Sequence, residues 1–375
     1  MSTDSFAAPF AMLDLPGPFV LESGARLPSL RVAYRTWGRL DEHGSNAVLV
    51  CHALTGSADV DRWWGPLLGP GRALDPERDF VVCSNVLGGC YGTTGPTSLR
   101  PDGRPWGPAF PDVSVRDIVR VQAALLDELG VRRLRLVIGG SLGGMQVLEW
   151  ALIFPERVSA IAPIAISARH SAWTIALSET QRQAIAADPC WRGGHYPAED
   201  PPSAGLAAAR MVAMCSYRSR ASLEARFGRD KAPDGRYAVE SWLHHHGRAL
   251  VDRFDPNTYV TLTRAMDTHD VGRDRGGWRE ALATVNVPAL VVSIDSDVLY
   301  PPLEQEELAA ALPDARLVTL RSPHGHDAFL IEGEATNGLV AAFRAVLAER
   351  NALPGRSVPH SAARAAARKE QPWVA

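Results

Sequence analysis

Residues 134–152 have the sequence LRLVIGGSLGGMQVLEWAL, and this stretch decides the fold. The apolar, β-branched run 134–138 is typical of a buried strand, and residues 145–152 are typical of a helix. The turn between them, GGSLG (139–143), has the G-x-S-x-G spacing that lifts a serine hydroxyl above a sheet. Its glycines and the helix N-terminus behind it suit a strained turn facing a developing oxyanion. We therefore predict that Ser141 is a nucleophile.

The competing interpretation of this turn is a phosphate-binding loop. Such a loop requires a lysine after its glycines, where this chain has Leu142 and Met145, and the dinucleotide spacing G-x-G-x-x-G is also missing. The sequence therefore favours the nucleophile turn.

Apolar runs like 134–138 recur along the chain and alternate with helical stretches. They lie at residues 47–50, 80–82, 161–166, 290–294 and 317–320. Continuous apolar strands separated by helices indicate a parallel sheet covered on both faces. Together with the serine turn, they predict an α/β-hydrolase fold with a doubly wound, mostly parallel sheet.

The strand pattern stops for a long internal segment. Residues 168–287 contain helix-forming stretches and are rich in Arg and His, which predicts a helical lid inserted into the core. The core would then consist of residues 1–167 and 288–350. Residues 351–375 are rich in Pro, Ala and Arg, and we expect this tail to be disordered.

Composition and charge limit the classes of function. The chain has 375 residues, 46% of them hydrophobic, and a net charge of -3, which gives no basic field for nucleic acid. A signal-peptide pattern and long apolar runs are missing, so we expect a cytoplasmic protein without a membrane partner. The five cysteines form no C-x-x-C pair and suggest reduced thiols. The adjacent histidines 244–246 would point in different directions, so we expect no metal site.

A serine nucleophile requires a histidine base oriented by a carboxylate, in the chain order Ser, Asp, His. Asp295 and Asp297 follow the run 290–294, and His324 and His326 follow the run 317–320. Catalytic partners belong at the carboxyl ends of parallel strands, which is where all four lie. Spacing alone leaves both choices open.

An oxyanion hole requires two backbone N–H groups. One would come from Leu142, directly after the nucleophile, and the other from a loop after an earlier strand. The segment HALTG (52–56) follows the run 47–50 and is positioned to supply it through Leu54.

Four motifs occur in order along the chain. They are HALTG (52–56), NVLGGCYGTTGP (85–96), GGSLGGMQ (139–146) and GHDAFL (325–330). Together they resemble the homoserine O-acyltransferase family of methionine biosynthesis, and the resemblance runs from about residue 33 to residue 347. It implies a homodimer through the lid, with no bound cofactor, in which a CoA thioester is the co-substrate of ping-pong acyl transfer to homoserine.

The resemblance also assigns residues. It implies that Ser141 is the nucleophile, His326 the base and Asp297 the orienting acid, and that Asp327 holds the homoserine amine. Arg210 matches the family's substrate-binding arginine, and a planar guanidinium suits a carboxylate.

The acyl donor is less well determined. Family members that use succinyl-CoA resemble one another in having an arginine two residues after the triad aspartate, where this chain has Leu299. An apolar side chain there favours acetyl-CoA, because a buried succinyl carboxylate requires a cation. Arg218 or Arg220 of the lid is an alternative partner for that carboxylate. Serine as the acceptor, a plain esterase and a non-catalytic binding module remain rival interpretations.

Overall fold

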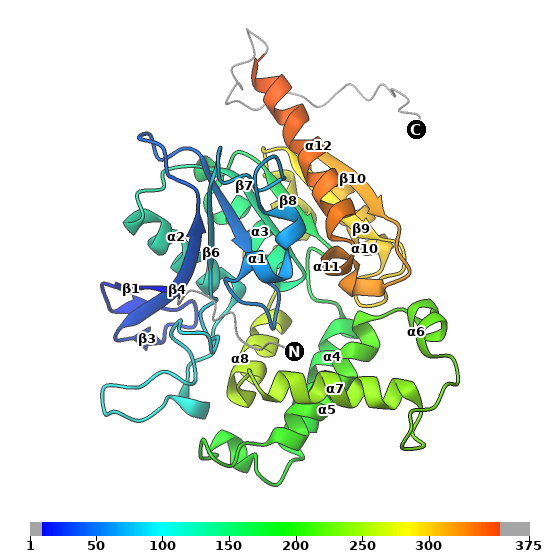
Figure 1. Ribbon diagram of the computed structural model, residues 1–375. Helices are drawn as coiled ribbons and strands as arrows, with labels where there is room; N and C mark the ends of the chain where they lie inside the picture. The colour runs from blue at the N-terminus through cyan, green and yellow to red at the C-terminus, as the bar shows by residue number, and fades with distance from the viewer. Residues whose placement is uncertain (1–9, 353–375) are drawn as a thin grey trace.

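The computed structural model describes residues 10–352 (Figure 1). In this part of the chain, eight strands form one sheet in the order β1-β4-β6-β5-β7-β8-β9-β10, and β2 and β3 form a separate pair. The strands are β1 (Ala11–Leu15), β2 (Phe19–Val20), β3 (Arg26–Leu27), β4 (Leu30–Trp37), β5 (Ala47–Cys51), β6 (Phe80–Ser84), β7 (Leu134–Gly140), β8 (Ile161–Ile164), β9 (Ala289–Ile294) and β10 (Ala315–Leu320).

The strands from β6 to β10 are parallel, whereas β1 and β4 extend the sheet in antiparallel fashion. Each of the six apolar runs predicted as strands overlaps a strand, although β8 ends at Ile164 where the predicted run continued to residue 166. The predicted α/β-hydrolase architecture is confirmed. The sequence analysis did not predict β4. Polar residues such as Arg31, Arg35 and Thr36 interrupt its buried apolar positions, so they form no continuous apolar run.

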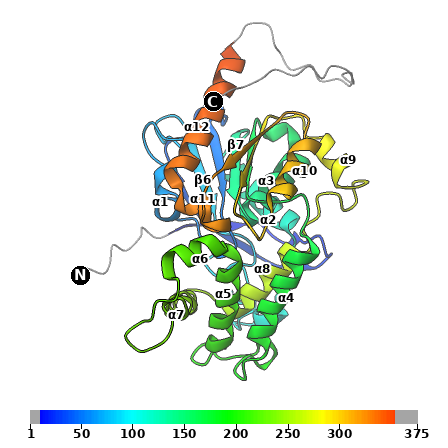
Figure 2. The same cartoon turned by 90° about the vertical axis from the view of Figure 1, so that its right-hand side faces the viewer.

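Helices cover both faces of the sheet because its strands are apolar on both sides. Along β5, Val48 and Val50 belong to one buried cluster and Leu49 and Cys51 to the other. Helices α1 (Val60–Trp63), α11 (Ala328–Ile331) and α12 (Gly333–Ala352) contribute to the first cluster. Helices α2 (Val115–Glu128), α3 (Leu142–Ile153) and α10 (Pro302–Ala311) contribute to the second (Figure 2).

The chain between β8 and β9 is helical. It forms α4 (Ala172–Ala186), α5 (Ser203–Tyr217), α6 (Arg220–Phe227), α7 (Ala238–Val251), α8 (Pro256–Asp267) and α9 (Trp278–Ala283). Helices α4 to α8 form a layer below the sheet in Figures 1 and 2, with α5 packed between α4 and α7. We call this layer the lid.

The exact domain boundaries given above remain predictions. Helix α12 extends to Ala352, and the rest of the tail predicted to be disordered lies outside the described residues. Within residues 10–352, no helix is both long and apolar enough to cross a bilayer.

Candidate active site

The turn that carries Ser141 is held by close backbone packing. Ser141 lies between β7 and α3 with φ 57° and ψ -128°, and its N–H donates to the Ile164 carbonyl at 3.1 Å. A Cβ atom on Gly139 would lie 2.6 Å from the Cys51 carbonyl oxygen, and one on Gly143 only 2.1 Å from it. Only glycine fits at these two positions. The absence of their side chains lets the turn pack directly against the end of β5.

The two predicted oxyanion donors lie in neighbouring segments. Leu142 is the first residue of α3, where a backbone N–H has no acceptor within the helix. Leu54 follows β5. The Gln146 side-chain amide donates to the Leu142 carbonyl at 3.0 Å and to the His52 carbonyl at 3.3 Å. This bridge ties the helix N-terminus to the loop that carries Leu54.

His52 holds the same loop from its other side. The Val86 N–H donates to His52 Nε2 at 3.2 Å, so the ring proton is on Nδ1, which lies 2.8 Å from the Ala53 carbonyl oxygen. Burial lowers the pKa of His52 to about 4, which keeps the ring neutral at physiological pH. His52 therefore supports the loop that carries Leu54 rather than serving as a base.

The motif at 85–96 supports this loop as well. The Asn85 side chain accepts from the Ala58 N–H and donates to the Tyr91 carbonyl, both at 2.6 Å. Arg253, which follows α7, donates to the Thr55 carbonyl at 2.8 Å and to the Tyr91 hydroxyl at 2.5 Å. The motif and the lid thus both bind the segment that contains Leu54.

Asp297 and His326 form a buried pair at the ends of β9 and β10. His326 Nδ1 lies 2.8 Å from one carboxylate oxygen of Asp297, and the side chains are 4% and 0% exposed. The other carboxylate oxygen accepts the N–H groups of Leu299 at 2.8 Å and Tyr300 at 3.0 Å. Because both oxygens accept hydrogen bonds, the carboxylate is fixed in orientation.

The electrostatics of the pair suit a base. Burial works to lower the pKa of His326, but the charge of Asp297 and its hydrogen bond outweigh burial, and with a contribution from Asp327 the pKa is raised above its ordinary value. His326 Nε2 is buried and makes no hydrogen bond to another described residue. That nitrogen can accept a proton, since hydrogen bonds to a nucleophile often form only when substrate is bound.

The structure separates the rival residues by their contacts. Asp295 accepts the Ser322 N–H at 3.0 Å, and His324 Nδ1 lies 3.2 Å from the Arg218 guanidinium. Neither Asp295 nor His324 takes part in the Asp297–His326 hydrogen bond. Asp295 instead contacts the loop that leads to His326, and His324 lies within that loop.

Three aromatic rings surround His326. The sequence analysis did not assign a role to any of these rings. The ring centroids of Tyr217, Tyr300 and Phe329 lie 5.7, 5.4 and 5.7 Å from that of His326. They come from the lid, the loop after Asp297 and helix α11. No spacing in the sequence relates three separate segments, although Phe329 lies within the motif at 325–330.

The predicted substrate-binding residues lie beside the cage, the three aromatic rings around His326. The Arg210 guanidinium stacks on Tyr217 at 5.3 Å from the ring centroid. Burial raises the pKa of Asp327, while the charges of His326, Arg210 and Arg218 act to lower it. Leu299 is 7% exposed, with its backbone bound to Asp297 as described above. The lid thus brings positive charge to a partly buried carboxylate next to His326.

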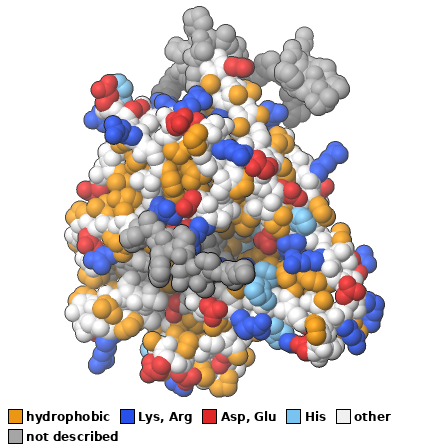
Figure 3. Space-filling view, in the orientation of Figure 1, with side chains coloured by type: hydrophobic (Ala, Val, Ile, Leu, Met, Phe, Trp, Pro, Cys, Tyr) orange, Lys and Arg blue, Asp and Glu red, His pale blue; other side chains and the backbone are white. Residues whose placement is uncertain are grey.

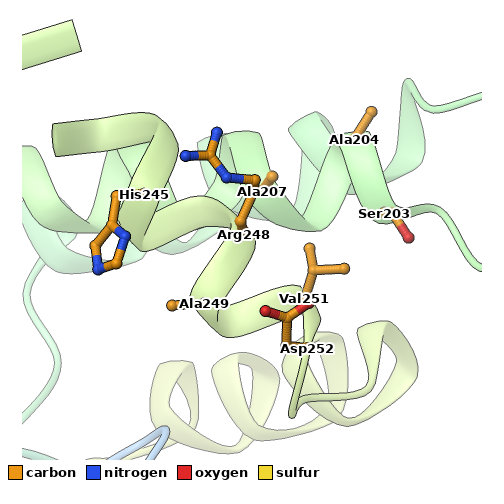
Figure 4. A pocket seen from close by; sticks show the side chains of 8 residues that line it. All are labelled: Ser203, Ala204, Ala207, His245, Arg248, Ala249, Val251 and Asp252. Atoms are coloured by element: carbon orange, nitrogen blue, oxygen red, sulfur yellow. The ribbon is translucent and has the colours of Figure 1, made fainter. Parts of the chain in front are cut away.

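Two other features of the lid lie apart from this cage. A cavity of about 450 Å³ between α5 and α7 is lined by Ser203, Ala204, Ala207, His245, Arg248, Ala249, Val251 and Asp252 (Figure 4). It includes none of the predicted site residues.

Basic and histidine side chains gather over the lid in the lower right of Figure 3. In the described part of the chain, no group of three His, Cys, Asp or Glu side chains could hold a metal ion.

Known proteins resemble this chain over most of its length. The alpha/beta hydrolase fold family matches residues 46–332. A homoserine O-acetyltransferase from Trichormus variabilis is 60% identical over 332 residues, which are 88% of this chain and 92% of that protein.

Solved structures agree on the fold. Esterase E22 is 27% identical with a TM-score of 0.82, covering 89% of this chain and 98% of its own. A homoserine O-acetyltransferase from Bacillus anthracis is 24% identical with the same TM-score, covering 90% of this chain and 98% of its own. The chain belongs to the homoserine O-acetyltransferase family of the α/β-hydrolase fold.

Proposed function

We propose that this protein transfers an acetyl group from acetyl-CoA to the hydroxyl of L-homoserine, a reaction of methionine biosynthesis, with Ser141 carrying the acetyl group. One observation supports it above others. Beside the Asp297–His326 pair, a partly buried carboxylate on Asp327 lies near the guanidinium of Arg210. Opposite charges at this point suit the ammonium and carboxylate of an amino acid, and a hydrolase of simple esters does not require them.

The first half of the reaction acetylates the serine. His326 Nε2 takes the proton of the Ser141 hydroxyl as its oxygen attacks the thioester carbonyl carbon. The N–H groups of Leu54 and Leu142 stabilise the oxyanion that forms. When the C–S bond breaks, the CoA thiolate takes the proton from His326 and leaves, and the acetyl group remains on Ser141.

The second half moves the acetyl group to the acceptor. Asp327 holds the ammonium and Arg210 the carboxylate of homoserine, so that its hydroxyl lies near the acyl-enzyme. His326 removes the proton from that hydroxyl, the oxygen attacks the acetyl carbonyl, and the Ser141–acetyl bond breaks as His326 returns the proton to the serine. The lid favours transfer over hydrolysis by limiting the access of water.

The proposal is tested by mixing the purified protein with each donor, acetyl-CoA or succinyl-CoA, and each acceptor, homoserine or serine, and measuring released thiol. We expect the fastest release with acetyl-CoA and homoserine. Similar release without any amino acid would instead make the protein a hydrolase, the activity named for esterase E22.

Donor choice is tested at Leu299. Replacing this buried leucine with arginine introduces a cation that can pair with a succinyl carboxylate, so Leu299→Arg should raise the ratio of kcat/KM for succinyl-CoA to that for acetyl-CoA by about tenfold or more. Leu299→Met keeps the apolar character and is the matched control. An unchanged ratio in Leu299→Arg, in protein that still folds, would remove Leu299 from the account of specificity.

The cytoplasm as the site of action and a homodimer formed through the lid belong to the same proposal. Family resemblance supports the homodimer. Light scattering of the purified protein measures its mass directly, and a monomer at micromolar concentration would contradict it.

A further inference from the structure

The loop at 322–325, which leads directly into His326, is held from the core by the loop that carries Asp297. The Ser322 N–H donates to Asp295 at 3.0 Å, and the Ser296 hydroxyl donates to the Ser322 carbonyl at 2.5 Å. Ser296 also accepts the Gly325 N–H at 2.9 Å. Three hydrogen bonds therefore fix the histidine loop relative to its acidic partner.

The lid holds the same loop from the opposite side. The Arg218 guanidinium donates to His324 Nδ1 at 3.2 Å and to the Ser222 hydroxyl at 2.8 Å. Ser222 Oγ also lies 3.1 Å from His324 Nδ1, and the Ser219 hydroxyl donates to the Pro323 carbonyl. We call Arg218, Ser219, Ser222 and His324 the clasp. A guanidinium only donates, so Nδ1 is the acceptor and the neutral ring carries its proton on Nε2.

The clasp requires close contact between lid and loop. Gly325 has φ +70°, and a Cβ atom there would lie 2.6 Å from the backbone nitrogen of Ser219. A side chain at position 325 would be strained by its backbone conformation and would also push the lid away. The lid and the histidine loop thus meet backbone to backbone, one residue before His326.

The charge in the clasp is nearly enclosed. Arg218 is 9% exposed, its Nε has no hydrogen-bond partner, and among residues 10–352 it forms no ion pair with a carboxylate. Its bonds go to neutral acceptors, and the far side of the His324 ring faces Glu332, with Nε2 3.9 Å from Oε1. Losing an acceptor from a buried cation is costly, so the side chain at position 324 should strongly affect the loop.

We propose that Arg218 and His324 are positioning residues, which hold the loop at 322–325 against the lid and thereby set the orientation of the His326 imidazole toward Asp297. This proposal rests on the proposed function only in taking His326 as the base. It gives the lid a second role besides covering the site, because lid side chains then determine whether the base is correctly placed.

The test compares His324→Leu, which removes the acceptor, with His324→Asn, whose amide oxygen can lie near the position of Nδ1. The readouts are kcat, KM for each substrate and the pH dependence of kcat/KM. We expect His324→Leu to lower kcat by roughly 10- to 100-fold, the effect of losing a hydrogen bond to a charged group. KM should change little, and His324→Asn should recover most of the activity.

The pH profile separates positioning from general support. Groups facing His326 are the carboxylates of Asp297 and Asp327 and the rings of Tyr217 and Tyr300. A loosened Asp297–His326 bond leaves burial as the dominant influence, so the acid limb of the His324→Leu profile should move to lower pH. A rise in KM for homoserine with an unmoved acid limb would show instead that the clasp binds substrate, and would overturn the proposal.

Three further variants keep the test decisive. Arg226→Gln alters an exposed arginine of α6 and should leave kcat and the acid limb unchanged, whereas Arg218→Gln should repeat the His324→Leu result. If His324→Leu fails to fold, as judged by thermal unfolding, Ser222→Ala makes a smaller change in the same clasp. Wild-type activity in Arg218→Gln or in Ser222→Ala would contradict the proposal.

A second substrate separates this proposal from the proposed function. p-Nitrophenyl acetate can acetylate a serine nucleophile without CoA or homoserine, so nitrophenol release reports on Ser141, His326 and the oxyanion donors without any contribution from binding of the natural substrates. If the protein uses another acceptor, the clasp variants should still slow this release and shift its acid limb. Unaltered release of nitrophenol by the clasp variants would refute the positioning role of Arg218 and His324, whatever the natural substrates are.

Discussion

The loop that carries Ser141 is held by its backbone, whereas the loop that carries His326 is held by side chains. At the nucleophile, the Cys51 carbonyl occupies the space that Cβ atoms on Gly139 and Gly143 would need. At the histidine, hydrogen bonds from the loop after β9 and from the lid do the same work. Backbone packing leaves almost no freedom to adjust, while side-chain hydrogen bonds can be weakened one at a time. Substitutions in the two regions should therefore fail in different ways.

The largest effect is expected where the chemistry itself is removed. Ser141→Ala deletes the atom that carries the acetyl group, so kcat for thiol release should fall by about 10⁶-fold. The protein should still fold, because the turn conformation depends on the neighbouring glycines. Circular dichroism and thermal unfolding provide that control. Substantial remaining release would mean that acyl transfer does not pass through this serine.

The next effect tests the backbone packing directly. Gly143→Ala places a methyl group 2.1 Å from the Cys51 carbonyl oxygen, so it should lower the free energy of unfolding by about 1–3 kcal/mol or more and reduce kcat as well. Gly338→Ala is the matched control, because an added Cβ on that exposed helical glycine meets nothing within 4 Å. It should stabilise the protein by about 0.5–1 kcal/mol. Equal stability of the two variants in urea would count against close packing.

A smaller effect is expected at the support of the oxyanion loop. His52→Leu removes the acceptor of the Val86 N–H, and displacement of the Leu54 N–H should lower kcat by about 10- to 100-fold, less than the loss of an oxyanion donor outright. His52→Gln retains an acceptor of similar reach and should keep most of the activity. If both variants were equally slow, the histidine would have a role beyond this hydrogen bond.

The smallest effect concerns pH. His326 must be neutral to accept a proton, and its pKa is raised, so the acid limb of kcat/KM should lie above the ordinary histidine pKa of about 6.5. Asp327→Asn removes one negative charge that helps to raise it and should move the limb to lower pH. Asp112→Asn, an exposed substitution, should leave it in place. Hydrolysis of p-nitrophenyl acetate avoids effects on homoserine binding.

The same contrast explains what could be predicted from the sequence. The turn at Ser141 was predictable because its glycines are local and evenly spaced, and the parallel strands were predictable because burial on both faces makes them continuously apolar. Asp297 and Asp295 could not be separated by spacing, since the distinction depends on which carboxylate reaches His326. The contact between Arg218 and His324 joins residues 106 positions apart, and no local pattern encodes it.

Arg253 extends this picture to the far end of the lid. Its guanidinium binds the Thr55 carbonyl and the Tyr91 hydroxyl, while Arg218 binds His324. The lid is thus hydrogen-bonded both to the loop that carries Leu54 and to the loop that leads to His326. A displacement of the lid large enough to admit bulk water would break these hydrogen bonds, and both loops would then lose their support from the lid. An acetyl group on Ser141, as proposed, would be protected from hydrolysis in two ways. The closed lid excludes water, and a lid displaced far enough to admit water no longer holds the two loops in place.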